Sequence, residues 1–269
     1  MARVLPESRL HARRRKRRII LSGIAVVLCY GLVGGLVWLS WRPALRIQTV
    51  RVEGAQTVAS TTLERFVRQR LLGAYLGIIP RDNIFVYPKS RIEGDVRAAY
   101  PVFATAAVRA DNFSSLSLAI SERQPKETWC GASPDAPQPC LFLDESGAAY
   151  GAAPAFSGSP YVRYYGPLPG EALPKQFLSP GTAQALFALI DAIGVKAGEV
   201  ESVSINTDND VQTNFVSGFV LKFSLDDDSA KIFQRFALAL GSTPFTAHPL
   251  SAFLYLDLRF GDKLYYKLR

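Results

Sequence analysis

The longest apolar stretch of the sequence, Ile19–Trp41, contains 23 residues and no charge. As an α-helix it would measure about 34 Å at about 1.5 Å per residue, enough to cross a hydrocarbon layer of about 30 Å. Arg42 and Pro43 end the stretch. A cleaved signal peptide has a shorter apolar run followed by small residues, whereas this run ends Val-Trp-Leu-Ser-Trp. The pattern therefore predicts one uncleaved transmembrane helix.

After this helix, residues 46–123 alternate between strand-like and helix-like periodicity. Val50 and Val52 alternate with polar residues, and Thr61 and Glu64 have the spacing of a capping box ahead of an apolar helical pattern. The residues between 74 and 87 are expected to form a loop, and Pro88 suits the first turn of a helix. The order predicted here is β-α-α-β-β, with strands at 50–53, 104–110 and 116–120 and helices near 61–71 and 88–99.

The remaining part, 124–269, is predicted to be a mixed or antiparallel β-rich domain with two helices. Six prolines between 151 and 180 favour an irregular connection there. Ser179 is expected to cap a helix that ends at Gly194, and a second helix should end at Gly241. Strands are expected near 141–143, 201–205, 211–215, 219–225, 252–260 and 263–268, the last two forming a hairpin. The fold class is α+β.

Charge is concentrated at the start of the chain. Residues 1–18 hold eight Arg or Lys and one acid, so this tail carries +7 of the total charge of +8. The remainder is nearly neutral and offers no basic face for nucleic acid. Under the positive-inside rule the six consecutive basic residues at 13–18 keep the N-terminus in the cytoplasm. Trp38 and Trp41 would then lie at the outer interface, and everything after them outside the cytoplasm.

Three cysteines agree with this topology. Cys29 lies in the apolar helix and is read as a small apolar residue. Cys130 and Cys140 would lie on the oxidising side, where a disulfide between them is plausible and two free thiols are the alternative. No zinc site is expected, since His248 is the only histidine of that part. Gly31 and Gly35 have the spacing of a helix-packing motif, although glycine is common in such helices.

Candidate catalytic residues are few, and no cofactor, metal or small-molecule substrate is expected. His248 has no nucleophile motif with it. Asn206, Asp208 and Asp210 imitate the start of a calcium loop whose later ligands are absent, so a turn is the better interpretation. The alternative function is a membrane-anchored extracytoplasmic enzyme, such as a glycosyltransferase that would hold a nucleotide-bound metal with Asp226 and Asp228. Three acids ahead of a helix are more simply explained by the helix dipole.

Seven short segments, taken in their order along the chain, carry a resemblance to a known family. They are Val50–Gly54, Val58–Ser60, Asn83–Phe85, Tyr100–Pro101, Leu116–Pro125, Leu143–Gly147 and Leu256–Phe260. Together they resemble the FtsQ/DivIB cell division proteins, which have a basic cytoplasmic tail, one membrane helix, a POTRA domain and a β-rich domain. Two features depart from the family pattern. Asp111–Ser114 replaces the usual Arg-x-x-Pro, and the Cys130/Cys140 pair is not general to the family.

The resemblance implies a non-catalytic scaffold at the division septum of the cell membrane. Its domains would be a tail (1–18), a transmembrane helix (19–41), a POTRA domain (46–123) and an FtsQ-type β domain (124–269). FtsQ-like proteins bind FtsB- and FtsL-like membrane proteins and, through them, the septal peptidoglycan synthase. In the family the late strands bind the FtsB-like partner by strand addition. Mapped onto this chain, the binding residues are Leu258, Arg259, Phe260, Gly261, Asp262, Lys263, Tyr265 and Tyr266.

Overall fold

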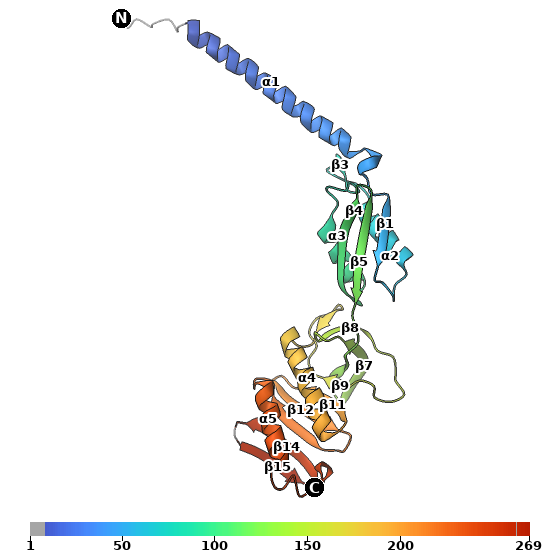
Figure 1. Cartoon of the computed structure of the whole chain (residues 1–269), viewed down its shortest axis with the longest axis vertical. Helices are drawn as coiled ribbons and strands as arrows, with labels where there is room; N and C mark the ends of the chain where they lie inside the picture. Colours follow the sequence, from blue (N-terminus) through green and yellow to red (C-terminus); the bar gives the residue numbers. More distant parts are fainter. Residues whose placement is uncertain (1–8, 262) are drawn as a thin grey trace, which may run out of the picture. The chain divides into compact units, whose positions relative to one another are not determined.

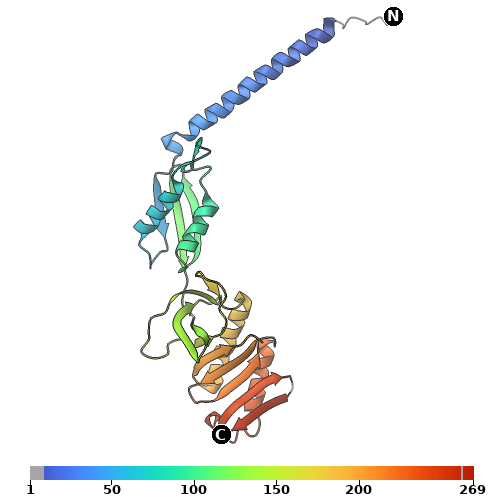
Figure 2. The same ribbon diagram turned by 180° about the vertical axis from the view of Figure 1, so that it is seen from behind.

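The computed structural model describes residues 9–261 and 263–269, and the chain is an α+β protein (Figures 1 and 2). Its described residues divide into two compact units. The first contains the residues up to Val96 together with Thr105–Ser121, and the second contains Arg97–Ala104 and Glu122–Arg269. Short 3₁₀ helices lie at Pro43–Leu45 and Leu250–Ala252.

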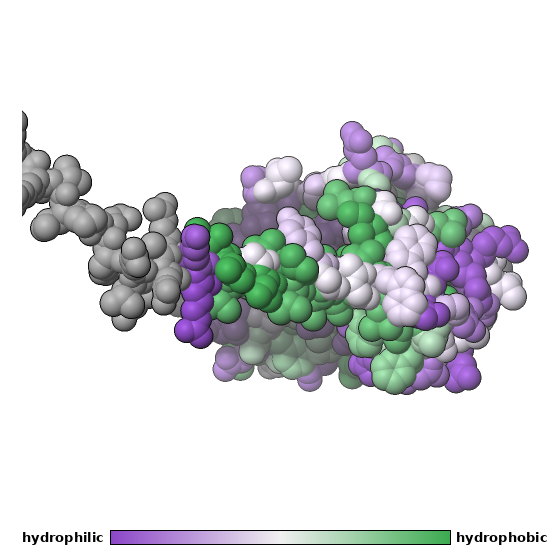
Figure 3. Space-filling model, turned by 90° about the horizontal axis from the view of Figure 1, so that it is seen from above, coloured by the Kyte–Doolittle hydropathy of each residue, from purple (hydrophilic) through white to green (hydrophobic). Residues whose placement is uncertain are grey.

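A single long helix, α1 (Arg9–Ser40), begins the described chain. Its 25-residue segment Lys16–Ser40 is long and apolar enough to cross a membrane, and no other helix of the described residues is. None of the most apolar part of this segment is buried against protein, and Figure 3 shows many green, hydrophobic side chains exposed on the surface. The predicted long apolar helix is confirmed, and it extends toward the N-terminus through the basic residues.

The sheet of the first unit has three strands in the order β1-β5-β4. β1 runs parallel to β5, with Val50 opposite Leu116. Figure 2 shows α2 and α3 on the same face of this sheet. A two-stranded hairpin, β2–β3, lies in the segment that was expected to be a loop. The bounds are β1 Thr49–Glu53, α2 Ser60–Leu71, β2 Ala74–Tyr75, β3 Ile79–Pro80, α3 Lys89–Ala99, β4 Phe103–Asn112 and β5 Ser115–Glu122.

The core of the first unit follows from helical spacing. Leu63, Val67 and Leu71 recur every four residues and are buried, so α2 presents one apolar stripe to the sheet. Ile92 and Val96 do the same on α3. The buried apolar strand residues of this unit are Val50, Ala106, Val108, Leu116, Leu118 and Ile120.

The second unit is built on one ten-stranded sheet in the order β10-β8-β7-β6-β9-β11-β12-β13-β14-β15. Most neighbouring strands are antiparallel, but β9 is parallel to both β6 and β11, and β13 is parallel to β14. The strands are β6 Glu127–Ser133, β7 Ala136–Leu143, β8 Ala148–Ala152, β9 Arg163–Tyr165, β10 Lys175–Gln176, β11 Val200–Ile205, β12 Asp210–Phe215, β13 Val220–Ser224, β14 Phe253–Phe260 and β15 Lys263–Leu268.

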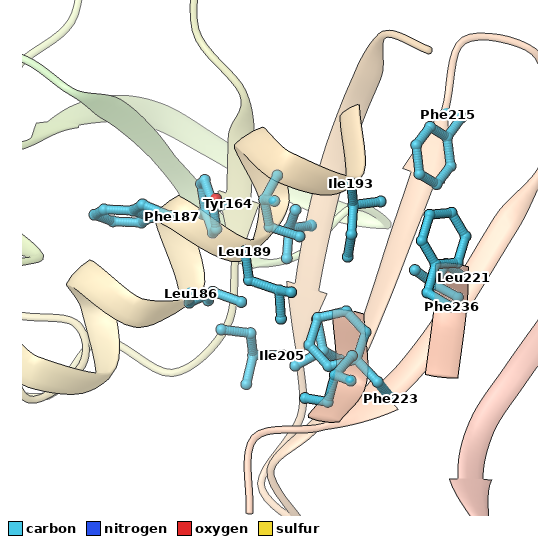
Figure 4. Packing of buried hydrophobic residues seen from close by; sticks show 14 of the residues in the cluster. Tyr164, Leu186, Phe187, Leu189, Ile193, Ile205, Phe215, Leu221, Phe223 and Phe236 are labelled. Carbon is cyan, nitrogen blue, oxygen red and sulfur yellow. The ribbon is translucent and has the colours of Figure 1, made fainter. Parts of the chain in front are cut away.

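Helices α4 (Pro180–Ala197) and α5 (Ser229–Leu240) cover one face of this sheet (Figure 2). In Figure 4 the side chains of Leu189 and Ile193 on α4 point toward those of the strands, among them Leu221 and Phe223. Fully burying one such leucine or phenylalanine stabilises the fold by about 1.5–3 kcal/mol. The strands alternate accordingly, with Val211, Thr213 and Phe215 buried on the helix side of β12.

Several sequence predictions for this unit need correction. The prolines between 151 and 180 predicted an irregular connection, and β9 was therefore missed. It occupies a central place in the sheet, and its residue Tyr164 is completely buried. β6, β8, β10 and the part of β7 before Leu141 were also missed. Helix α4 does not end at Gly194 but continues to Ala197, with Gly198 as its C-cap at φ 102°. Ser179 does cap this helix, because its hydroxyl accepts a hydrogen bond from the Thr182 N–H.

Cys130 on β6 and Cys140 on β7 are joined by a disulfide with an S–S distance of 2.01 Å. The bond spans the hairpin that Pro134 and Asp135 turn. Cys29 is a free, exposed cysteine in α1. A covalent link here fixes two neighbouring strands of the large sheet to each other.

Candidate partner-binding edge

The C-terminal hairpin, β14–β15, forms one edge of the large sheet. β14 is inside the sheet, since it pairs in parallel with β13 (Leu221 opposite Leu256) and antiparallel with β15 (Leu256 opposite Tyr266). β15 is the last strand in the order, and within the described chain nothing pairs with its outer side. Its backbone can therefore accept one more strand.

The direction of the free backbone groups follows from one hydrogen bond. Arg269, directly after β15, donates its N–H to the Ala252 carbonyl at 2.9 Å. Because N–H groups alternate in direction along an antiparallel strand, those of Leu264, Tyr266 and Leu268 are expected to point away from β14. An added strand would use these three donors.

The helix side of β15 is apolar and only partly covered. Tyr266 packs its ring against Phe245 (5.5 Å between centroids) and Phe253 (6.0 Å). Nevertheless Leu264, Tyr266 and Leu268 all stay 40–43% exposed, because α5 does not extend over the last strand. The hydrophobic core between the sheet and its helices thus continues to β15, where its apolar side chains remain partly exposed to solvent.

The opposite side of β15 is basic and aromatic. Tyr265 lies opposite Asp257 in the register and packs edge-on against Phe260, with 5.2 Å between the ring centroids. Alternation places Lys263 and Lys267 on this same side. Edge lysines discourage uncontrolled pairing between sheets, so they fit both a protected edge and an edge selective for acidic segments.

Arg259 is occupied within the fold. Its guanidinium donates to both carboxylate oxygens of Asp257, the shortest contact being 2.6 Å, and to Asp210 on β12 at 2.5 Å. Burial opposes ionisation of Asp257, but the hydrogen bonds and charge of Arg259 outweigh it and hold the pKa of Asp257 below its usual range. Hydrogen bonding to Asp257 first, and then to Asp210, raises the pKa of Arg259. Arg259 therefore ties β14 to β12.

The expected binding residues consequently divide into groups. Phe260, Lys263, Tyr265 and Tyr266 are exposed at the edge, and Gly261 occupies the turn at φ 61°. Leu258 is buried in the core, so its side chain does not reach the edge. Asp262 lies outside the described residues.

One residue at this edge was missed by sequence reasoning. Arg235 on α5 donates to the Gly261 carbonyl at 2.6 Å and pairs with Asp227. It thereby fixes the turn between β14 and β15. Asp227 and Arg235 are eight positions apart, so no helical i,i+4 spacing marks them in the sequence.

The residues considered for catalysis have local roles. Asp228 caps α5 by accepting from the Lys231 N–H at 3.0 Å, and Asp226 accepts from the Asn209 amide at 2.9 Å. Asn206 accepts the N–H groups of Asp208 and Asp210, which confirms the expected turn between strands. His248 is exposed. The described residues contain no group of three or more His, Cys, Asp or Glu able to hold a metal ion.

No protein-family model matches this sequence, and no curated protein matches it either.

Proposed function

We propose that this protein is an FtsQ/DivIB-type scaffold of the bacterial division machinery, anchored by α1 with its basic N-terminus in the cytoplasm. In this proposal the first unit is a POTRA domain, and its β-α-α-β-β order, with the short β2–β3 hairpin between the two helices, supports that assignment. The second unit is the docking domain. The protein would act at the septum, where it would bind FtsB- and FtsL-like single-helix proteins and thereby link them to septal peptidoglycan synthesis.

The observation that carries the proposal is the uncovered β15 edge. A partner segment would add as a strand, and its N–H and C=O groups would pair with those of Leu264, Tyr266 and Leu268. Main-chain pairing supplies affinity in this mode, and side chains on alternate positions supply selectivity.

The chemistry of the two faces defines the partner segment. On the helix side it would carry apolar residues that extend the core beyond Leu264 and Tyr266. On the other side it would carry acidic residues opposite Lys263 and Lys267, because unlike charges stabilise cross-strand pairs. Such an alternating apolar and acidic strand next to a membrane helix is the expected partner sequence.

The test is a single proline at the edge. In Leu264→Pro the outward N–H is lost while the pairing of β15 with β14 should remain, since proline is tolerated on edge strands. Leu264→Ala keeps the N–H and is the matched control. Tagged full-length variants would be purified in detergent from cells that also express tagged FtsB- and FtsL-like proteins. We expect Leu264→Ala to retain the partners and Leu264→Pro to lose them at least tenfold.

The results of this experiment distinguish a wrong binding site from a wrong function. Equal capture of the partners by both variants would reject the β15 site. If the unmodified chain captured neither partner, and a fluorescent fusion spread evenly around the cell instead of gathering at midcell, the scaffold proposal itself would fail.

A further inference from the structure

Exposed apolar side chains of the first unit gather in one region. Beyond α1 and the adjoining Trp41, every large exposed hydrophobic residue described in this unit lies between 72 and 86 or at 113. The most exposed is Leu76, at 96%, which lies at the tip of the β2–β3 hairpin. We call this group the hairpin cluster, and it comprises Leu72, Tyr75, Leu76, Ile78, Phe85, Val86 and Phe113.

The hairpin cluster is bound to the C-terminal end of α1. The indole N–H of Trp41 donates to the Ile78 carbonyl at 2.7 Å, and the buried Asn83 donates its amide to the Ser40 carbonyl at 2.9 Å. A main-chain bond from Ile84 to the Leu45 carbonyl (3.0 Å) adds a third link. These three hydrogen bonds therefore hold the β2–β3 hairpin next to Trp41, at the end of α1.

The same region carries arginines on aromatic faces. The Arg42 guanidinium lies 3.8 Å from the ring centroid of Trp38, and Arg81 lies 5.6 Å from that of Tyr75. Amphipathic aromatic rings prefer the headgroup level of a bilayer, and guanidinium groups bind phosphates. A surface that combines exposed apolar side chains with such arginine–aromatic pairs has the composition of one that lies in a membrane interface.

We propose that the hairpin cluster is a lipid-binding surface, seated in the headgroup and upper acyl region of the leaflet that the C-terminal end of α1 reaches. The ligand is a phospholipid bilayer with anionic headgroups, whose phosphates contact Arg42 and Arg81 while Leu76 and Phe85 enter the acyl boundary. This inference rests on the membrane anchor of the proposed function. It goes further in placing the hairpin end of the first unit on the membrane surface instead of on a free stalk.

Depth-dependent quenching tests the inference on the full-length chain. Cys29→Ser removes the free thiol, and a single cysteine at Leu76→Cys or Phe85→Cys carries an NBD fluorophore. Val195→Cys is the control, since Val195 lies on α4 of the second unit and is also highly exposed, at 89%. The proteins are reconstituted into vesicles of phosphatidylcholine and phosphatidylglycerol with nitroxide-labelled lipids. We expect quenching at both hairpin positions at least threefold above that at 195, and stronger with a shallow than with a deep nitroxide.

Two results would overturn the inference while leaving the anchor in place. Quenching at 76 and 85 as weak as at 195, in a chain that resists carbonate extraction, would show that the cluster does not enter the lipid. A probe that iodide cannot reach but that nitroxide lipids do not quench would show that a protein covers the cluster. Release of the chain by carbonate would instead reject the anchor, and both proposals with it.

Discussion

Glu127 shows how tertiary structure alters the chemistry of a single residue. It opens strand β6, is only 5% exposed, and accepts one hydrogen bond from the Val162 N–H at 2.8 Å. It lines a cavity of about 500 Å³ beside the Lys126–Asp191 ion pair. Burial raises the pKa of Glu127 to about 7, with a smaller contribution from Asp191, while the Val162 N–H and Lys126 act in the opposite direction. Burial raises the pKa of Tyr164, and the negative charge of Glu127 adds to that increase.

The first prediction concerns the pH dependence of stability through Glu127. Its pKa is higher in the folded than in the unfolded state, so folding favours the protonated form and stability falls as pH rises from about 4.5 to about 7. Glu127→Gln keeps an acceptor for Val162 and removes the charge. It should raise the free energy of unfolding by about 2–3 kcal/mol at about pH 8 and by less than about 1 kcal/mol at about pH 5.

Urea unfolding of the detergent-solubilised chain, followed by near-ultraviolet circular dichroism at both pH values, measures this difference. Asp191→Asn is a useful comparison, because it leaves the Glu127 charge in place. A constant difference between Glu127→Gln and the unmodified chain across the two pH values would contradict the buried-carboxyl account.

At the scale of the element, the ends of α2 and α4 differ from those that local sequence signals predict. The expected capping box at Thr61 and Glu64 is wrong, since α2 begins at Ser60 with Ala59 as N-cap and no side-chain cap. At α4 the glycine at 194 was expected to end the helix, yet the chain continues in helical form to Ala197. A mid-helix glycine costs only about 1 kcal/mol relative to alanine, and continuing the helix beyond Gly194 packs Ala197 against the core.

The β6–β7 hairpin carries the second prediction. The Cys130–Cys140 bond closes a short loop with a separation of 10 residues. In the chain-entropy model, closing a loop of this size stabilises the folded state by about 2–3 kcal/mol. The double variant Cys130→Ser/Cys140→Ser should lose about that much free energy of unfolding.

The control for this loss is reduction of the unmodified protein. Dithiothreitol should lower its urea midpoint to that of the double variant and leave the variant itself unchanged. Equal stability of the oxidised protein and the double variant would show that the bond contributes nothing to the fold.

At the scale of the whole molecule, charge and hydropathy predict sidedness. The tail carries +7 and precedes one apolar helix, while the rest of the chain is nearly neutral. Positive charge is retained on the cytoplasmic side, so the two units are expected outside the cytoplasm. An exposed β15 edge would then meet partners on that side of the membrane.

The third prediction follows from this sidedness. Protease added to intact spheroplasts should remove a C-terminal tag and degrade the part after Trp41, while a cytoplasmic marker protein stays intact. Protection of the units in spheroplasts and their loss only after lysis would reverse the orientation. Replacing the six basic residues at 13–18 with alanine should increase the protected fraction severalfold.

The sequence alone determined the features that depend on local pattern. The apolar run of α1, the alternation of β12 and the terminal hairpin could each be read from periodicity, because a helix or a half-buried strand imposes its own repeat on side chains. Four of the expected edge residues, Phe260, Lys263, Tyr265 and Tyr266, proved to be exposed on that hairpin.

Tertiary structure alone decided what depends on distant neighbours. β9 has only three residues and becomes a central strand because β6 and β11 lie on either side of it. Leu258 and Phe260 share one alternation, yet only Leu258 is buried, since the ladder is irregular between Asp257 and Phe260. Arg259 turns inward because Asp210, 49 positions away, supplies a carboxylate. No local pattern encodes such contacts, because they form only when segments far apart in the chain pack together.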